Sequence, residues 1–145
     1  MNEIRRPGRL ALAGGIALSL GLAGIAAAWS QAAAELPTTV EIPIRYSHYE
    51  RKELKVRAGA AVTFVLENKD PIDHEWIVGD TAVHERHRTG TEPVHGSRPT
   101  EVTIPAGATR TTTVTFGTPG TYLYICHLPG HEAYGMVGTV VVEGP

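Results

Sequence analysis

Short segments in which apolar and polar residues alternate fill most of the chain after residue 34. Val40, Ile42 and Ile44, for example, fall on one face of residues 39–46. Alternation with a period of two puts every second side chain on the same face of a β-strand. The pattern therefore predicts strands that bury one face and expose the other.

Turn residues separate these segments, including Gly59, Gly107 and the Pro119–Gly120 pair. Pro followed by Gly suits the centre of a type II turn. After residue 34, no long segment shows a sustained helical period. The predicted strands are residues 39–46, 53–57, 61–67, 75–78, 101–104, 110–116, 121–125 and 136–143. Seven or eight short strands separated by turns predict an all-β fold, a two-sheet antiparallel β-sandwich.

The N-terminal part of the chain has a different pattern. Arginines within residues 5–9 precede residues 10–28, which carry no charge, and small alanines follow at 32–34. This order is typical of a secretory signal peptide. The apolar stretch is longer than a usual signal core, so retention as a membrane anchor is the alternative. We therefore predict a signal peptide or N-terminal membrane anchor in residues 1–34, and one domain in residues 35–145.

Either interpretation places the domain outside the cytoplasm, because the positive flank stays inside. We expect a periplasmic, cell-surface or secreted protein, anchored to the membrane if the segment is kept. The formal net charge of the chain is −2, without a basic patch, which argues against nucleic acid as a partner. The chain has one cysteine, so an internal disulfide is excluded and a free thiol in an exported protein needs another explanation.

Metal binding supplies that explanation. Cys126, His131 and Met136 follow a C-x4-H-x4-M pattern between the last two predicted strands, and His74 lies far upstream. Two imidazoles, a thiolate and a weak thioether suit one copper ion that cycles between Cu(I) and Cu(II). The plainer interpretation is a buried cysteine and a methionine that fills the core. Three different donor types on one short loop, which Gly130 helps to bend, favour the metal.

Two stretches of the sequence resemble known proteins. Residues 120–142, GTYLYICHLPGHEAYGMVGTVVV, are similar to the copper loop of the cupredoxins, the small blue copper proteins. The four-residue gaps on both sides of His131 look most like the rusticyanin and sulfocyanin branch, because plastocyanins have a shorter gap between the cysteine and the histidine. Residues 68–76 resemble the loop and strand start that carry the first histidine ligand.

The resemblance implies a Greek-key cupredoxin sandwich that holds one copper ion per chain. It makes His74, Cys126 and His131 the equatorial ligands and Met136 the axial ligand. One residue departs from the pattern. In several family members an Asn or Ser follows the first histidine and ties the two ligand loops together, whereas Glu75 cannot donate a hydrogen bond when ionised. The same ligands would also hold zinc.

The remaining histidines lie mainly in residues 79–100, the least regular part of the domain. A helical turn would place His84 and His87 on one face, and His95 could join them in a second metal site, for zinc or type 2 copper. The interpretation we favour is an exposed loop whose polar side chains face water. His127 is expected to point away from the metal, and His48 to be solvated.

The function we expect is one-electron transfer between redox proteins. The carrier is expected to be a monomer that docks near His131 through an apolar rim of Leu128, Pro129, Ala133 and Tyr134. The alternative is an extracytoplasmic copper-binding or delivery protein that uses the same site and residues 84–95. We do not expect an enzyme, because copper oxidases and nitrite reductases use several domains and further copper ligands, and this chain has no H-x-H pair.

Overall fold

The computed structural model describes residues 36–91 and 98–144, which belong to one compact unit. The expected signal peptide or membrane anchor in residues 1–34 lies outside the described residues, as does His95. Among the residues that are described, no helix has the length and apolar character needed to cross a membrane.

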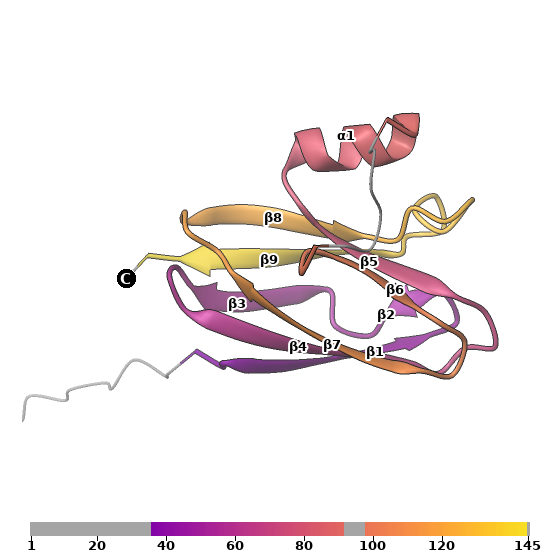
Figure 1. The fold of residues 1–145 in the computed structure, drawn as a ribbon, viewed down its shortest axis with the longest axis horizontal. Coiled ribbons are helices and arrows are strands. Elements are labelled where there is room, and N and C mark those ends of the chain that lie inside the picture. Colours follow the sequence, from indigo (N-terminus) through magenta and orange to yellow (C-terminus); the bar gives the residue numbers. More distant parts are fainter. Residues whose placement is uncertain (1–35, 92–97, 145) are drawn as a thin grey trace, which may run out of the picture. The chain divides into compact units, whose positions relative to one another are not determined.

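Two β-sheets pack face to face, which confirms the predicted sandwich (Figure 1). The first sheet contains, in spatial order, β2 (His48–Tyr49), β1 (Thr39–Arg45), β4 (Ala61–Asn68) and β7 (Thr109–Thr115). The second contains β3 (Glu53–Arg57), β9 (Val137–Glu143), β8 (Gly120–Ile125), β5 (His74–Gly79) and β6 (Glu101–Ile104). The expected strands are all present, and β2 is a two-residue addition that periodicity could not reveal.

Strand pairing differs from the purely antiparallel expectation in two places. β1 pairs with β4 in parallel, and β3 pairs with β9 in parallel, whereas the other pairs are antiparallel. Parallel neighbours need a crossover connection. Here the chain leaves the first sheet after β2, contributes β3 to the second sheet, and returns as β4 in the direction of β1.

The alternating apolar positions form the core between the sheets. Ile42, Ile44 and Val56 are fully buried, as the period-two pattern predicts. Aromatic rings fill the centre, where the Phe64 and Trp76 ring centroids lie 4.9 Å apart. Burying a large apolar side chain contributes about 1.5–3 kcal/mol, so this core can hold the loops at the strand ends in place.

Gly138 makes room for one of these rings. Its strand neighbour is Tyr124, and a Cβ atom at position 138 would lie 2.1 Å from the Tyr124 Cζ atom. Only glycine lets the Tyr124 ring cross β9 at this point. The ring then packs against Tyr49 with centroids 5.0 Å apart, at the end of the core nearest Cys126.

A helix, α1 (Thr81–Thr89), interrupts the segment for which we expected an exposed loop. The Asp80 side chain caps its first turn by accepting a hydrogen bond from the Val83 amide at 3.0 Å. Gly90 ends it in the left-handed conformation, with φ at 67°. Its buried residues are His84 and His87, so the helix lacks the aliphatic stripe on which periodicity depends. It packs against β5, on the outside of the second sheet (Figure 1).

Candidate metal centre

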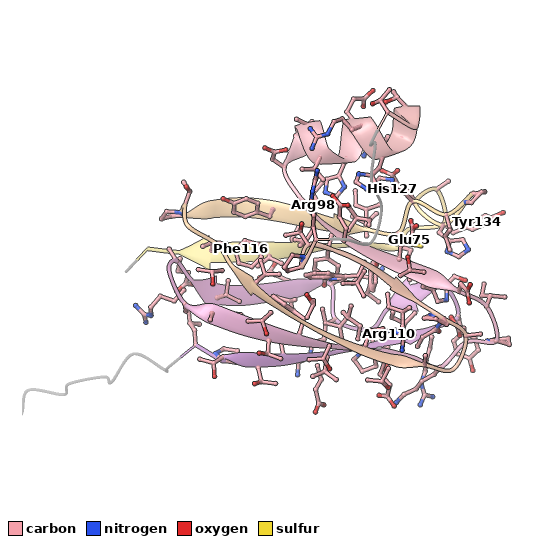
Figure 2. All side chains as sticks on the ribbon, in the orientation of Figure 1. Glu75, Arg98, Arg110, Phe116, His127 and Tyr134 are labelled. Atoms are coloured by element: carbon pink, nitrogen blue, oxygen red, sulfur yellow. The ribbon has the colours of Figure 1, made fainter. Side chains whose placement is uncertain are left out.

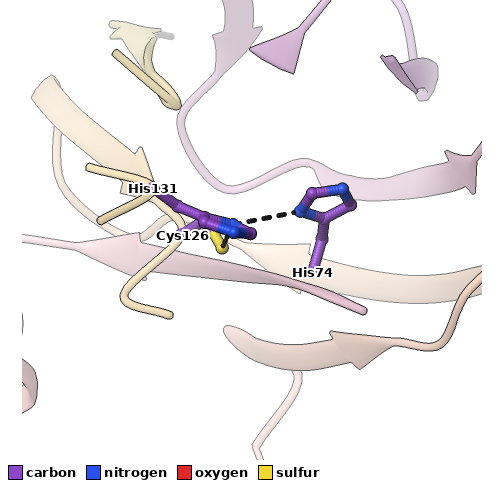
Figure 3. A group of neighbouring side chains, drawn as sticks. All are labelled: His74, Cys126 and His131. Carbon is purple, nitrogen blue, oxygen red and sulfur yellow. Dashed lines mark hydrogen bonds between the residues drawn. The ribbon is translucent and has the colours of Figure 1, made fainter. Parts of the chain in front are cut away.

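Three of the four predicted ligands converge at one end of the sandwich (Figure 3). His74 begins β5, Cys126 directly follows β8, and His131 lies on the loop after Cys126. Their donor atoms all lie within 4.8 Å of one another. Within residues 36–91 and 98–144, this is the one group of three His, Cys, Asp or Glu side chains arranged to hold a metal ion.

Antiparallel pairing explains how residues so distant in sequence meet. Ile77 of β5 lies opposite Ile125 of β8, so the start of β5 and the residue after β8 reach the same end of the sheet. The Nδ1 atoms of His74 and His131 are 3.2 Å apart, and the Cys126 Sγ atom is 3.2 Å from His131 Nδ1.

Turns fold the loop after Cys126 back on itself. The His131 amide donates to the Leu128 carbonyl at 3.0 Å, and the Met136 amide donates to the His131 carbonyl at 3.0 Å. The Cys126 amide then donates to the Met136 carbonyl at 3.2 Å. Met136 is therefore next to the site through its backbone, and its side chain is fully buried. Its role as axial ligand stays a prediction.

The sulfur of Cys126 is buried but not isolated. Burial raises the pKa of the thiol, and a hydrogen bond from the Glu75 amide opposes that rise. This amide lies 3.3 Å from Sγ and comes from the other ligand segment. The two ligand segments are thus tied together by the backbone of Glu75, so the tie does not depend on the side chain that replaces the family's Asn or Ser.

Asp70 fixes the orientation of His74. Its Oδ2 atom lies 2.9 Å from His74 Nε2. Burial acts to raise the pKa of Asp70, but hydrogen bonds from the Ser47 and Tyr46 amides and from His74 outweigh it and lower the pKa. The ionised carboxylate can only accept, so Nε2 of His74 donates and Nδ1 is the ring nitrogen that faces the cluster.

Asn68 holds the loop that carries Asp70. This buried side chain shares its Nδ2 atom among the carbonyls of Ile72 (2.8 Å), Pro105 (3.0 Å) and Ile104 (3.1 Å). Its Oδ1 atom accepts from the Asp70 amide at 2.9 Å. Our sequence analysis missed both residues, although they lie in the stretch that resembles the first ligand segment.

The donor set fits copper. His74 Nδ1, His131 Nδ1 and the Cys126 sulfur lie close enough to one another for one ion to contact all three. Burial, followed by the influence of His74, lowers the pKa of His131 and favours its neutral form. Two imidazoles and a soft sulfur suit copper in both oxidation states.

The other described histidines lie outside this cluster. His127 lies beneath α1, outside the cluster (Figure 2), as expected for a residue that does not bind the metal. Its Nε2 atom is 3.0 Å from His84 Nδ1. Burial and the neighbouring His84 lower the pKa of His127 to about 4. The expectation that His84 and His87 face water is wrong, because they are 0% and 9% exposed. His48 is partly buried and contacts the Tyr46 carbonyl through Nδ1 at 2.7 Å.

Exposed apolar side chains lie on the loops that carry, or neighbour, the predicted ligands. Among the described residues, the large hydrophobic side chains that are exposed are Tyr46, Ile72 and Tyr134. Tyr134 and its neighbour Ala133 belong to the predicted rim, whereas Leu128 is partly buried against the core. Tyr46 and Ile72 flank the loop that carries Asp70. Exposed hydrophobic side chains thus occur both on the loop of His131 and at the loop of Asp70.

A two-sheet sandwich with a buried cysteine and two histidines at one end is the arrangement of a cupredoxin. The family model of copper binding proteins of the plastocyanin/azurin family matches residues 38–143, so the chain belongs to this family. The cofactor of this family is copper, which agrees with the donor set of His74, Cys126 and His131.

The chain is similar to two kinds of copper protein. The chain is 33% identical over 98 residues to the copper-resistant cuproprotein CopI of Rubrivivax gelatinosus, a match that covers 66% of this chain and 59% of that protein. The chain thus spans less than two thirds of this relative's length. It is 32% identical over 123 residues to auracyanin-A of Chloroflexus aurantiacus, which covers 74% of this chain and 75% of that protein.

A solved structure resembles the fold closely. The dithionite-reduced auracyanin of Roseiflexus castenholzii superposes with a TM-score of 0.63 at 26% identity, covering 74% of this chain and 98% of that one. These comparisons confirm the cupredoxin assignment. The finer likeness to the rusticyanin and sulfocyanin branch stays a prediction.

Proposed function

We propose that this protein is an exported one-electron carrier with a type 1 copper site. His74, Cys126 and His131 are the equatorial ligands and Met136 is the weak axial ligand. The observation that carries the proposal is the convergence of two imidazole Nδ1 atoms and one buried sulfur within 4.8 Å. When bound, copper supplies a centre that alternates between Cu(I) and Cu(II).

The protein's own groups keep this centre in one geometry. Asp70 holds the proton on His74 Nε2, and the Glu75 amide donates to the sulfur of Cys126 at 3.3 Å. Hydrogen bonds within the loop fix His131 between its turns. Cu(I) and Cu(II) prefer different coordination geometries. A rigid set of ligands limits the change in geometry between the two states, and this speeds electron transfer.

The apolar surface near His131 is where we expect redox partners to dock. Small interfaces suit transient redox encounters. Tyr134 is 72% exposed and Tyr46 is 87% exposed, and burying them against a partner would favour a complex without fixed polar contacts. We propose that both the donor and the acceptor are redox proteins outside the cytoplasm, where the N-terminal segment would direct or anchor the chain.

Copper binding and delivery is the second candidate. It is favoured by the similarity to a protein whose name describes it as a copper-resistant cuproprotein. A fully buried cysteine beside two histidines suits retention of the metal better than its release. The histidines of α1, which a delivery route would use, are buried at its contact with the sheet rather than open to water.

Spectroscopy of the purified protein with added Cu(II) tests the site. We expect an intense visible band and narrow copper hyperfine splitting in the EPR spectrum, both lost in Cys126→Ser. The matched control is His48→Ala, a histidine outside the cluster, which should keep both signals. A colourless protein with ordinary type 2 copper signals would show that the type 1 assignment is wrong and would favour copper or zinc handling as the function.

Redox cycling separates the two candidate functions. A carrier should bleach on reduction, recover its colour on reoxidation, and keep its copper in the presence of a Cu(I) chelator throughout. A delivery protein should lose Cu(I) to the chelator after reduction. Loss of copper within one cycle would contradict electron transfer as the function.

A further inference from the structure

Helix α1 contacts the copper loop at the two residues that directly follow the ligands in sequence. Glu132 follows His131, and His127 follows Cys126. Arg88 of α1 binds Glu132, and His84 of α1 contacts His127. Both contacts join residues more than 40 positions apart, so they form only when α1 packs against this face of the domain.

The Arg88–Glu132 pair has the geometry of a strong ion pair. Arg88 Nη2 donates to Oε1 at 2.6 Å, and Nε donates to both carboxylate oxygens at 3.1 Å. The hydrogen bonds from Arg88 lower the pKa of Glu132, so the carboxylate is ionised at neutral pH. Two-point binding fixes direction as well as distance, which a single lysine contact would not do.

The second contact is a short chain of imidazoles. His84 Nε2 lies 3.2 Å from the Leu123 carbonyl, which can only accept, so Nε2 donates. His84 Nδ1 then accepts from His127 Nε2 at 3.0 Å. The ring of His87 stacks on that of His127 with centroids 5.3 Å apart. The Glu132 Oε2 atom lies 3.4 Å from His127 Nδ1, which carries no proton when Nε2 donates, so this contact is not a hydrogen bond.

The helix itself is held firmly enough to support the loop. Its first turn is capped by Asp80. Val83 packs so tightly on the end of β5 that a Cβ atom at Gly79 would lie 2.7 Å from Val83 Cβ. A surface hollow of about 390 Å³ lies between α1 and the loop, lined by His87 and Arg88 on the helix side and by His127 and Glu132 on the other.

We propose that α1 is a positioning element for the copper loop, in which Arg88 and His84 hold Glu132 and His127 and thereby fix the adjacent ligands His131 and Cys126. This inference rests on the proposed copper site, which it deepens. The hydrogen bonds of His131 inside the loop are short-range. Its amide donates to the Leu128 carbonyl, and its carbonyl accepts from the Met136 amide. The contacts with α1 tie the loop to a separate element.

Hydrogen exchange of the copper-free protein tests the positioning role without the metal. In Arg88→Gln, the loop amides of His131, Tyr134 and Met136 should exchange about fivefold faster, the scale of a partly exposed ion pair. Glu85→Gln is the matched control, because Glu85 also pairs with Arg88, at 3.6 Å, but does not touch the loop. Amides of β8 and β9 should exchange as in the wild type. Equal loop exchange in the two variants would overturn the proposal.

Copper retention provides the second readout. We expect Arg88→Gln to lose copper to a chelator about fivefold faster than Glu85→Gln, with a changed hyperfine splitting, because the loop that carries His131 would open more often by that factor. Arg88→Glu and Glu132→Arg should each have the same effect, and the double reversal should restore retention. Failure of the double reversal to restore it, in variants with wild-type circular dichroism, would argue against a specific contact.

The two proposals fail in different ways. If the wild-type protein lacks the type 1 spectrum, the proposed function is wrong, and the exchange experiment still reports on the loop. If the wild-type spectrum is present but Arg88→Gln matches Glu85→Gln in exchange and retention, the copper site stands and the role of α1 is wrong.

Discussion

Replacing Asp70, one residue of a loop, should lower the free energy of unfolding of the domain by a large amount. Its carboxylate accepts from the Tyr46 amide (2.7 Å), the Ser47 amide (2.8 Å) and His74 Nε2 (2.9 Å). Tyr46 and Ser47 have φ values of 53° and 55°. This left-handed conformation costs roughly 1–2 kcal/mol for each non-glycine residue, so the turn between β1 and β2 depends on its bonds to Asp70.

The size of the effect follows from these contacts. Hydrogen bonds to a charged group contribute about 1.5–3 kcal/mol each. Water can enter at a residue that is 8% exposed and replace part of what is lost, and the contributions are not additive. We therefore expect Asp70→Ala to lower the free energy of unfolding by about 3–5 kcal/mol, a large part of the roughly 5–15 kcal/mol of a whole domain.

Urea denaturation of the copper-free protein, followed by circular dichroism and tryptophan fluorescence, measures this change. With a slope of about 2 kcal/mol per molar, the midpoint should fall by about 2 M. Asp73→Ala is the matched control in the same loop, because Asp73 accepts one hydrogen bond, from the Ala106 amide at 2.9 Å. Its cost should be about 1 kcal/mol. An Asp70→Ala variant no less stable than the control would refute the reasoning.

Asp70→Asn tests the link between this carboxylate and the metal. With its NH2 group at the position of Oδ2, the asparagine would donate to His74 and favour a free Nε2 and a proton on Nδ1, the atom that faces Cys126 and His131. We expect copper affinity to fall 10–100-fold, measured by competition with a chelator. Unchanged affinity would show that Asp70 supports the turn and does not control the tautomer of His74.

Three further predictions concern the axial ligand, the docking surface and the core. Met136→Leu should keep the visible band and raise the reduction potential by about 60 mV, a tenfold shift in the oxidised-to-reduced ratio, because loss of a donor disfavours Cu(II); an unchanged potential would remove Met136 from the ligand set. Ala133→Asp should slow bimolecular electron transfer to a redox partner without bleaching the copper, whereas Ala61→Asp, at the far end of β4, should not; equal rates would place docking elsewhere. Gly138→Ala should cost about 3 kcal/mol in urea denaturation, because Tyr124 must move from its place against β9; a loss below 1 kcal/mol would mean that the ring has room to shift.

Several features of the fold could be read from local pattern alone. The alternation of Val40, Ile42 and Ile44 predicted a strand that the structure buries on one face, because a period of two is a property of a single segment. The short spacing between Cys126 and His131 likewise predicted that two metal-binding side chains lie within one loop. Local patterns also explain the error about α1, since buried histidines in place of leucines leave the helix without an apolar period.

Local patterns in the sequence are enough to locate the strands and the turns between them, and to point to metal chemistry through one cysteine, two histidines and a methionine. Three features appear only in the folded molecule: which strands run parallel, that Asp70 bonds both His74 and a turn more than 20 residues away, and that Arg88 of α1 reaches Glu132. The sequence does not reveal these contacts because backbone period and turn preference act within a few residues. Contacts between distant segments form only when the sheets and α1 pack together, and no short pattern in the chain records which partners will meet.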